Sequence, residues 1–297
     1  MNFVSPEISV CIDVPIQLGE CPVWDEDSGL LWFVDITAPA LLSFDPETQA
    51  LEKYSMPSPI GSMGLATQNR LVVALKTGVH LFNPASGTLE FLVNPELDRP
   101  GNRLNDGKVG PDGCFWVGSM DEKSSRQNTN ISGALYRVTP SGESTRVLDG
   151  LFVSNGLAWS PDGKTMYHAD GLSPSIKAFD FDPSSGAVSN ERVLITFDYL
   201  EVGWPDGATT DANGNYWSAG IFKGRINQVS PQGELLRSIQ MPVVGTTMPC
   251  FGGKSGKTLF VTSLAADAND GHQVGTLLSV EMDAQGAPVF RFGQRDA

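Results

Sequence analysis

The chain has 297 residues, of which 40% are hydrophobic and 18% are charged, a composition typical of a folded soluble protein. Its net charge of −14 provides no excess of Lys and Arg to neutralise phosphates, so we do not expect it to bind nucleic acid. No stretch approaches the roughly 18 apolar residues of a membrane span, and the N-terminus lacks a signal-peptide pattern. The four cysteines form no Cys-x-x-Cys pair, and we predict a reduced, cytoplasmic protein.

A recurring pattern predicts the fold. Each copy has a turn rich in Asp and Gly, an apolar or aromatic strand, and a second strand that ends near a further turn. The copies cover residues 23–50, 65–89, 109–144, 157–188, 208–235 and 251–286. A spacing of about 40–50 residues is typical of propeller blades, and Asn-Gly and Asp-Gly turns favour tight hairpins. The sequence therefore predicts an all-β fold, a six-bladed β-propeller.

The ends of the chain suggest how this ring closes. Residues 9–15 (SVCIDVP) and 288–294 (PVFRFGQ) each have the character of an additional strand. We expect N- and C-terminal strands to pair in one closing blade, which leaves no free sheet edge. No linker or composition shift divides the chain, so we predict a single domain over residues 1–297.

Two segments resemble ligand-binding loops but are predicted to be turns. The segment GGKSGKT (252–258) lacks the first Gly of a phosphate-binding loop, where Phe251 stands, and a strand rather than a helix follows it. The segment DANGN (211–215) is followed by Tyr216 where a calcium-binding EF-hand requires Gly. The histidines are isolated, although His168 and Asp170 lie on one predicted strand and could both point into a site.

Four segments precede blades and place a polar residue where the chain enters an innermost strand. They are LGECPVWD (18–25), GNRLNDGKVG (101–110), VSNGLAWS (153–160) and GWPDGATTD (203–211). In a propeller these entries converge on the central channel, so Glu20, Asn105, Asn155 and Asp206 could meet there. The alternative interpretation is structural, because Asn-Gly and Asp-Gly are also typical of turns.

At these residues the sequence resembles the gluconolactonase, senescence-marker-protein and regucalcin-like sugar lactonases. The motifs GECPVW, RLNDGKV, SNGLAWSPDG, PDG and PCFGG occur in the order of that family, over about residues 15 to 290. The resemblance implies a six-bladed propeller with one catalytic divalent cation in its channel. It places the cation ligands at Glu20, Asn155 and Asp206, and the sugar contacts at Arg103 and Asn105.

A further acidic substrate contact of the family aligns with a basic residue in this chain. In some members it follows a Gly-Ser/Thr-Met segment, where this chain has Lys123 at the aligned position, preceded by Asp121 and Glu122. We take Glu122 as a weak candidate for the contact. Cys21 follows Glu20 directly, and we expect it to point away from the cation because successive strand residues face opposite sides.

Two carboxylates and an amide oxygen make a hard, all-oxygen ligand set. Ca²⁺ is the first choice for such a set, with Zn²⁺, Mg²⁺, Mn²⁺ and Fe²⁺ as alternatives. A divalent cation can stabilise the oxyanion that forms when water attacks an ester, and Asp206 could accept the proton of that water.

The predicted function is metal-dependent hydrolysis of a sugar lactone to the aldonic acid, by a monomer or small homo-oligomer. Two alternatives remain: hydrolysis of another ester or a phosphotriester, and a non-catalytic calcium-binding or regulatory propeller. A sugar-facing Arg103 favours catalysis, because calcium buffering alone does not need it.

Overall fold

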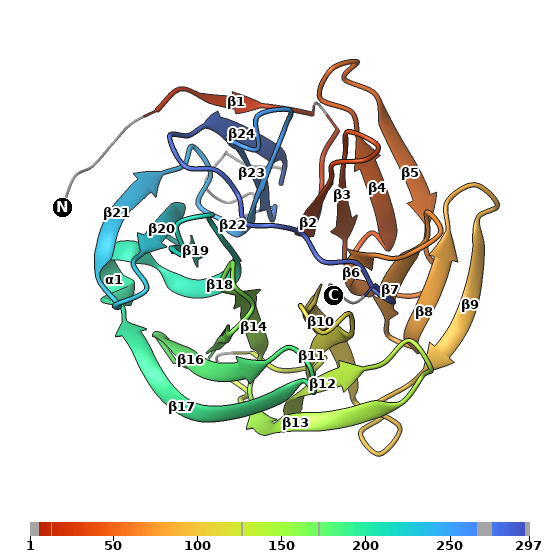
Figure 1. Cartoon of the computed structure of the whole chain (residues 1–297). Helices are drawn as coiled ribbons and strands as arrows, with labels where there is room; N and C mark the ends of the chain where they lie inside the picture. The colour runs from red at the N-terminus through yellow and green to blue at the C-terminus, as the bar shows by residue number, and fades with distance from the viewer. Residues whose placement is uncertain (1–5, 13, 126, 172, 266–274, 295–297) are drawn as a thin grey trace.

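The computed structural model describes residues 6–12, 14–125, 127–171, 173–265 and 275–294. Within these residues 24 strands form six four-stranded antiparallel sheets, and one short helix, α1 (Tyr199–Val202), precedes the fifth sheet. The sheets stand around a central axis as the blades of a propeller (Figure 1). The predicted all-β, six-bladed fold is confirmed. No helix of the described residues has the length and hydrophobicity needed to cross a membrane.

The blades follow one another in chain order. Blade 1 contains β2 (Gly19–Asp25), β3 (Leu30–Asp35), β4 (Ala40–Phe44) and β5 (Leu51–Ser55). Blade 2 contains β6 (Ile60–Leu65), β7 (Leu71–Leu75), β8 (Gly78–Asn83) and β9 (Thr88–Val93). Blade 3 contains β10 (Asn102–Val109), β11 (Phe115–Asp121), β12 (Gly133–Val138) and β13 (Ser144–Leu151).

The second half of the ring repeats this plan. Blade 4 contains β14 (Ser154–Trp159), β15 (Thr165–Asp170), β16 (Ser175–Asp182) and β17 (Ala187–Thr196). Blade 5 contains β18 (Trp204–Thr210), β19 (Tyr216–Ile221), β20 (Arg225–Val229) and β21 (Leu235–Gln240). Blade 6 contains β22 (Thr246–Gly252), β23 (Thr258–Ser263), β24 (Leu277–Glu281) and, from the other end of the chain, β1 (Ile8–Val10).

The first strand of each blade lies nearest the axis and contacts the first strands of both neighbouring blades (Figure 1). These strands are almost wholly buried, as in β6 and β14, whereas outer strands such as β5 are largely exposed. Six hydrophobic clusters fill the spaces between adjacent blades, one for each of the six interfaces. The core is therefore a ring of inter-blade layers around the channel, which suits strands that are apolar on both faces.

The two loop-like motifs are hairpin turns, as predicted. Residues 253–257 connect β22 to β23, with Gly253 and Gly256 at positive φ. In the segment 211–215, Asp211 accepts the backbone N–H groups of Asn213 and Asn215 at 3.0 and 2.9 Å. It also accepts the indole N–H of Trp217, so its carboxylate holds a turn of blade 5.

The two ends of the chain close the ring in different ways. Strand β1 pairs with β24 and completes blade 6, which confirms closure by N- and C-terminal strands in one blade. The expectation that residues 288–294 form a strand of that blade is wrong. The edge of β24 is already taken by β1, and Phe292 instead makes one parallel bridge to Ala66 of blade 2.

Residues 286–293, here called the C-terminal strap, cross the middle of the ring (blue in Figure 1) and end beside blade 2. Ala287 N–H donates to Thr210 O of blade 5, and Phe292 N–H donates to Leu65 O of blade 2. The guanidinium of Arg291 lies 2.6 Å from both Asp25 and Asp27, which adds blade 1 to the strap's anchors. The strap therefore ties distant blades together across the channel.

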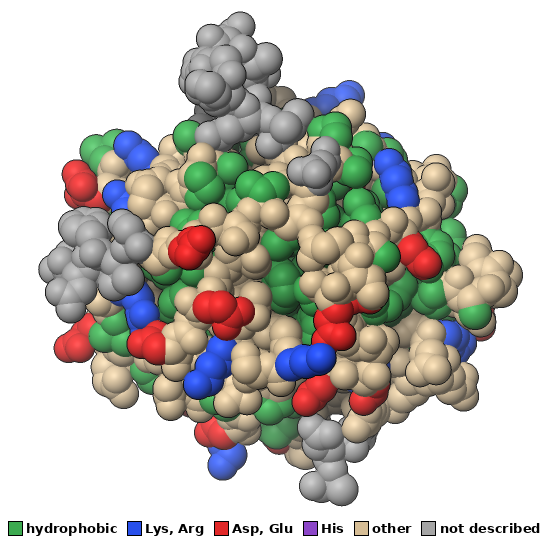
Figure 2. All heavy atoms as spheres, turned by 90° about the horizontal axis from the view of Figure 1, so that it is seen from above, with side chains coloured by type: hydrophobic (Ala, Val, Ile, Leu, Met, Phe, Trp, Pro, Cys, Tyr) green, Lys and Arg blue, Asp and Glu red, His purple; other side chains and the backbone are tan. Residues whose placement is uncertain are grey.

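The outer surface shows how the acidic excess is distributed. On the face in Figure 2, acidic and basic side chains are interspersed among hydrophobic and neutral polar ones. This face carries no broad patch of a single charge sign.

Candidate active site

Each of the six innermost strands shifts register at an equivalent place, as a β-bulge does. The shifts lie between Glu20 and Val23, Ile60 and Ser62, Leu104 and Gly107, Asn155 and Ala158, Pro205 and Ala208, and Thr246 and Met248. All lie toward the beginnings of the strands, at one end of the channel. A bulge re-aims side chains locally, so this ring of irregularities determines what faces the channel mouth.

Four of the predicted residues form one hydrogen-bonded chain across blades 3, 4 and 5. Arg103 Nη1 donates to Asn105 Oδ1 at 2.8 Å, and Asn105 Nδ2 donates to Asn155 Oδ1 at 2.7 Å. Asn155 Nδ2 in turn donates to Asp206 Oδ1 at 2.7 Å. Asn105, Asn155 and Asp206 are buried, so each polar group depends on its neighbour for hydrogen bonding.

Glu20 approaches this chain from blade 1 without a hydrogen bond to it. Its Oε2 accepts the backbone N–H of Cys21 at 3.1 Å. Burial raises the pKa of Glu20 well above its usual value, and the charges of Asp206 and Asp106 raise that pKa further. The N–H of Cys21 and the charge of Arg103 act in the opposite direction. Glu20 is therefore close enough to Asp206 for two like charges to interact unfavourably.

Asp206 is the second carboxyl group of this pair. Burial raises its pKa to about 8, and the negative charge of Asp106 adds to the effect. The carboxylates are thus crowded and poorly solvated, a state that a bound cation would relieve.

The residues present fit a hard divalent cation. Glu20 and Asp206 offer carboxylate oxygens, and Asn155 Oδ1, which accepts one hydrogen bond, keeps a second lone pair. Within the described residues no group of three His, Cys, Asp or Glu side chains is arranged for metal binding, so the amide of Asn155 is needed to complete a set of three. Such oxygen donors suit Ca²⁺, Mg²⁺ or Mn²⁺.

Glu122 stands apart from the hydrogen-bonded chain. It forms an ion pair with Lys76, and both side chains are more than a third exposed. Burial lowers the pKa of Arg103, an effect that the charges of Glu20 and then of Glu122 oppose. Glu122 is therefore within electrostatic reach of Arg103 but already has a partner.

Other residues with possible chemistry have structural partners. His168 is buried behind the site with Nε2 2.8 Å from Ser154 Oγ, and burial lowers its pKa to about 3. Asp170 accepts the backbone N–H groups of Phe152 and Val153. The sulfur of Cys21 lies 3.2 Å from Met63 O in the core between blades 1 and 2, as expected of a side chain that points away from the site.

One residue near the site was not predicted. Asp106 follows Asn105 in the RLNDGKV motif, and its charge raises the pKa of both Glu20 and Asp206. Its position within the motif could have indicated a role in the site. An Asp before Gly is also typical of a turn, however, so the motif alone does not separate the two interpretations.

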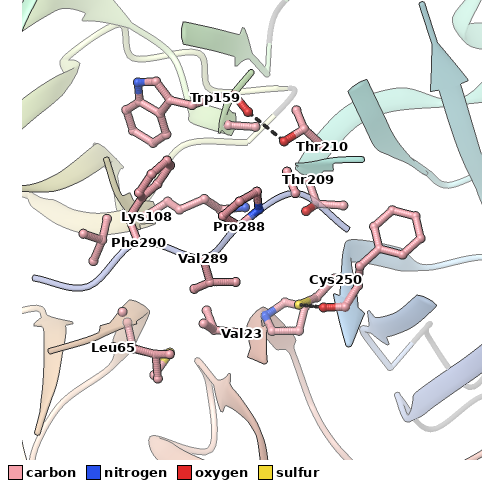
Figure 3. Close-up of a pocket in the computed structure, with 17 residues that line it drawn as sticks. Val23, Leu65, Lys108, Trp159, Thr209, Thr210, Cys250, Pro288, Val289 and Phe290 are labelled. Carbon is pink, nitrogen blue, oxygen red and sulfur yellow. Dashed lines mark hydrogen bonds between the residues drawn. The ribbon is translucent and has the colours of Figure 1, made fainter. Parts of the chain in front are cut away.

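The opposite end of the channel has a different lining. A partly open cavity of about 60 Å³ lies there, with room for a few water molecules (Figure 3). Val23, Leu65 and Trp159 line it from the blades, and Pro288, Val289 and Phe290 of the strap cover it. Lys108 also lines the cavity, and its Nζ donates to Ala208 O at 2.7 Å.

Comparisons with known proteins agree with this architecture. The chain is 35% identical to regucalcin of Xenopus laevis over 268 residues, which cover 90% of this chain and 89% of that protein. It is 35% identical to 6-deoxy-6-sulfogluconolactonase of Pseudomonas putida over 249 residues, 84% of each chain. The structure of a calcium-binding regucalcin from Agrobacterium tumefaciens superposes with a TM-score of 0.88 at 26% identity, covering 97% of this chain and 98% of that one. Residues 18–265 match the model of the SMP-30/Gluconolactonase/LRE-like region, and the chain therefore belongs to that family.

Proposed function

We propose that this protein is a metal-dependent hydrolase that opens a sugar lactone to the corresponding aldonic acid. The observation that carries the proposal is the hydrogen-bonded chain from Arg103 through Asn105 and Asn155 to Asp206, which faces Glu20 at one end of the channel. The lactonase among the relatives supports the reaction class, because its name describes a sugar lactone as its substrate.

Glu20, Asn155 and Asp206 would hold the divalent cation. We propose Ca²⁺ first, because the donors are all oxygen and a structurally similar relative is described as calcium-binding. Zn²⁺, Mg²⁺, Mn²⁺ and Fe²⁺ are the alternatives. When bound, the cation would polarise the lactone carbonyl and make nearby water more acidic.

The chain's own groups supply the rest of the chemistry. A carboxylate oxygen of Asp206 accepts the proton of the attacking water, and its crowded surroundings strengthen it as a base once the carboxyl is ionised. Arg103 donates to the sugar hydroxyls and lactone oxygens, and Asn105, whose two amide N–H groups are held by Ser154 O and Asn155 Oδ1, accepts a sugar hydroxyl at its Oδ1, so that the two residues fix the orientation of the ring. Glu122 could accept a hydrogen bond from a more distant hydroxyl after it leaves Lys76.

A calcium-binding protein without catalysis is the second candidate, and it is favoured by the regucalcin relatives. An assay of lactone opening separates the two. We expect the purified protein to open pentono- or hexonolactones, to lose that activity with a chelator, and to regain it when Ca²⁺ or another divalent cation is restored. If the protein binds Ca²⁺ but accelerates the opening of none of the pentono- and hexonolactones tested, the second candidate is supported and the first is refuted.

We also propose that residues 1–297 act as one domain, because blade 6 combines strands from both ends of the chain.

A further inference from the structure

Asp106 lies on β10 of blade 3 and reaches across to blade 4. The residue is 6% exposed, and its Oδ2 accepts the backbone N–H of Leu157 at 3.0 Å. Its Oδ1 has no hydrogen-bond partner of good geometry among the described residues, and the backbone N–H groups of Gly107 and Gly156 lie near enough to the carboxyl group to lower its pKa. A buried carboxylate with an unpaired oxygen costs stability, so it calls for a functional explanation.

Tyr216 reaches the same segment from the other side. It lies on β19 of blade 5, is fully buried, and donates its hydroxyl to Gly156 O at 2.7 Å. Gly156 has a φ of +64°, and a Cβ there would lie 2.5 Å from the Tyr216 hydroxyl. Only glycine permits this approach, so the Gly156–Leu157 segment is held from blade 3 by Asp106 and from blade 5 by Tyr216.

The segment held in this way directly follows Asn155. The Asn155 side chain must lie between Asn105 and Asp206, with 2.7 Å contacts to each. The bulge in β14 begins at this residue, so the regular ladder alone does not fix its backbone. Two hydrogen bonds from neighbouring blades replace that missing constraint.

We propose that Asp106 and Tyr216 are positioning residues, which clamp the Gly156–Leu157 segment so that Asn155 presents its amide oxygen to the cation. This inference rests on the proposed function for the role of the cation, but the clamp itself is a property of this chain. Groups that orient metal ligands typically change metal affinity by about 10–100-fold when they are removed.

Asp106 has a second effect that Tyr216 does not share. Its charge acts on Glu20 and Asp206, and the cationic groups facing these three carboxylates are Arg103 and Lys108. Burial raises the pKa of Asp106, and the N–H of Leu157 and the charge of Lys108 lower it. When ionised, Asp106 would add negative charge beside the proposed cation ligands and strengthen cation binding through the electric field.

Three substitutions separate these roles. Tyr216→Phe removes one half of the clamp and no charge. Asp106→Asn keeps an oxygen that can accept the Leu157 N–H but removes the charge. Tyr167→Phe is the matched control, because Tyr167 is also buried and packs on the Tyr216 ring at 5.2 Å. Within the described residues, the Tyr167 hydroxyl makes no hydrogen bond to residues 154–159.

Calorimetry with Ca²⁺ measures the outcome without reference to catalysis. We expect the dissociation constant to rise about tenfold in Tyr216→Phe and about 100-fold in Asp106→Asn, and to stay within twofold of wild type in Tyr167→Phe. A folded Tyr216→Phe variant that binds Ca²⁺ as tightly as the wild type would overturn the clamp.

Hydrogen exchange of residues 154–159 tests the clamp even in a protein that binds no metal. We expect this segment to exchange faster in Tyr216→Phe than in wild type or Tyr167→Phe, while the outer strands of blade 4 are unchanged. Unchanged exchange would refute the inference. Faster exchange in a protein that neither binds Ca²⁺ nor opens lactones would uphold the clamp and refute the proposed function.

Discussion

The two ends of the central channel are built from the same six strands but have opposite character. The beginnings of the strands carry Glu20, Arg103, Asn105, Asn155 and Asp206 around register shifts. The later parts of the strands are regular and surround a small cavity that the C-terminal strap partly covers. Irregular backbone and crowded carboxylates thus occupy one end, and apolar packing occupies the other.

The two ends of the channel contribute differently to stability and to the proposed activity. Like charges that are buried together oppose folding until a cation binds, so the mouth with its carboxylates costs stability. The covered end and the six inter-blade clusters offset that cost. Changes at the mouth should therefore alter activity most, and changes at the strap should alter stability most.

The largest effect is expected from Asp206→Asn at the mouth. The variant keeps an oxygen donor but loses the base, so the lactonase rate at saturating metal should fall by about 10²–10⁴-fold. In Glu20→Gln, by contrast, excess metal should recover much of the rate, because Glu20 only holds the cation. Asp162→Asn is the matched control, because Asp162 has the same Pro-Asp-Gly context but accepts bonds from Ser160 and Lys164 in a turn. Full activity in Asp206→Asn would refute the site assignment.

Removal of residues 288–297 tests the opposite end. The truncation removes Phe292, which is 3% exposed, uncovers the apolar residues that it packs against, such as Ala66 and Val72, and abolishes the strap's bonds to blades 1 and 2. We expect the free energy of unfolding to fall by about 3 kcal/mol and the melting temperature to fall by about 6 °C. The rate at 25 °C should stay within twofold of wild type, and a rate that falls as much as in Asp206→Asn would contradict the division between the two ends. Arg291→Ala, which removes only the ion pairs, should lower the melting temperature by less than about 2 °C.

The pH dependence of stability reports on the crowded carboxylates directly. The folded pKa of Asp206, about 8, lies above its unfolded value of 3.8, so the folded state holds more protons between these limits. The stability of the chelated protein should therefore fall as pH rises from 6.5 to 8, by about 1.4 kcal/mol per pH unit for each proton. His168, whose pKa burial lowers to about 3 in the folded state, acts in the opposite direction near pH 6.5, where its unfolded imidazole is half protonated, and this contribution fades above about pH 7.5. The free energy of unfolding, measured with urea at each pH, should fall less steeply with pH in Asp206→Asn or with Ca²⁺ present. A pH dependence that is unchanged in both cases would contradict the assignment of the effect to these carboxylates.

A smaller effect is expected for Arg103→Ala. Loss of a charged donor to the substrate should raise KM about tenfold. Ca²⁺ affinity should stay within threefold, because Arg103 cannot ligate a cation and instead opposes its charge. Steady-state kinetics and calorimetry provide the two values, and a loss of Ca²⁺ binding as large as the change in KM would place Arg103 in the cation site instead.

The smallest effect is expected for Glu122→Gln. The residue is exposed and its ion pair with Lys76 contributes at most about 1 kcal/mol. We expect KM to change by less than about threefold on the preferred lactone. A larger change restricted to one sugar configuration would establish Glu122 as a specificity residue.

The repeated turns allowed the propeller to be predicted, but identical short motifs do not identify the site. Pro-Asp-Gly occurs at 111–113, 161–163 and 205–207. Asp112 binds Trp116 and Arg137, and Asp162 binds Ser160, so two copies form blade turns. Only Asp206 lies at the beginning of an innermost strand. Asp206 directly precedes the repeat copy 208–235, whereas Asp112 and Asp162 lie inside copies, and this difference can be seen in the sequence.

The strap and Asp106 could not be predicted in the same way. Residues 288–294 have the composition of a strand, and only the position of β1 on the edge of β24 excludes them from blade 6. The role of Asp106 depends on a bulge in another blade, between Asn155 and Ala158. Such contacts between distant segments are properties of the assembled ring and not of local sequence.

The ring of register shifts also shows where new chemistry could be introduced. Blades 2 and 6 present Gly61 and Thr247 at the equivalent positions. A side chain at Gly61 would meet the backbone of Leu104 at 2.4 Å, so blade 2 is closed to substitution. Thr247 already has a side chain, which donates to Gly19 O at 2.6 Å, next to Glu20. A protein engineer who wishes to add a donor while leaving the four existing positions intact would therefore begin at Thr247.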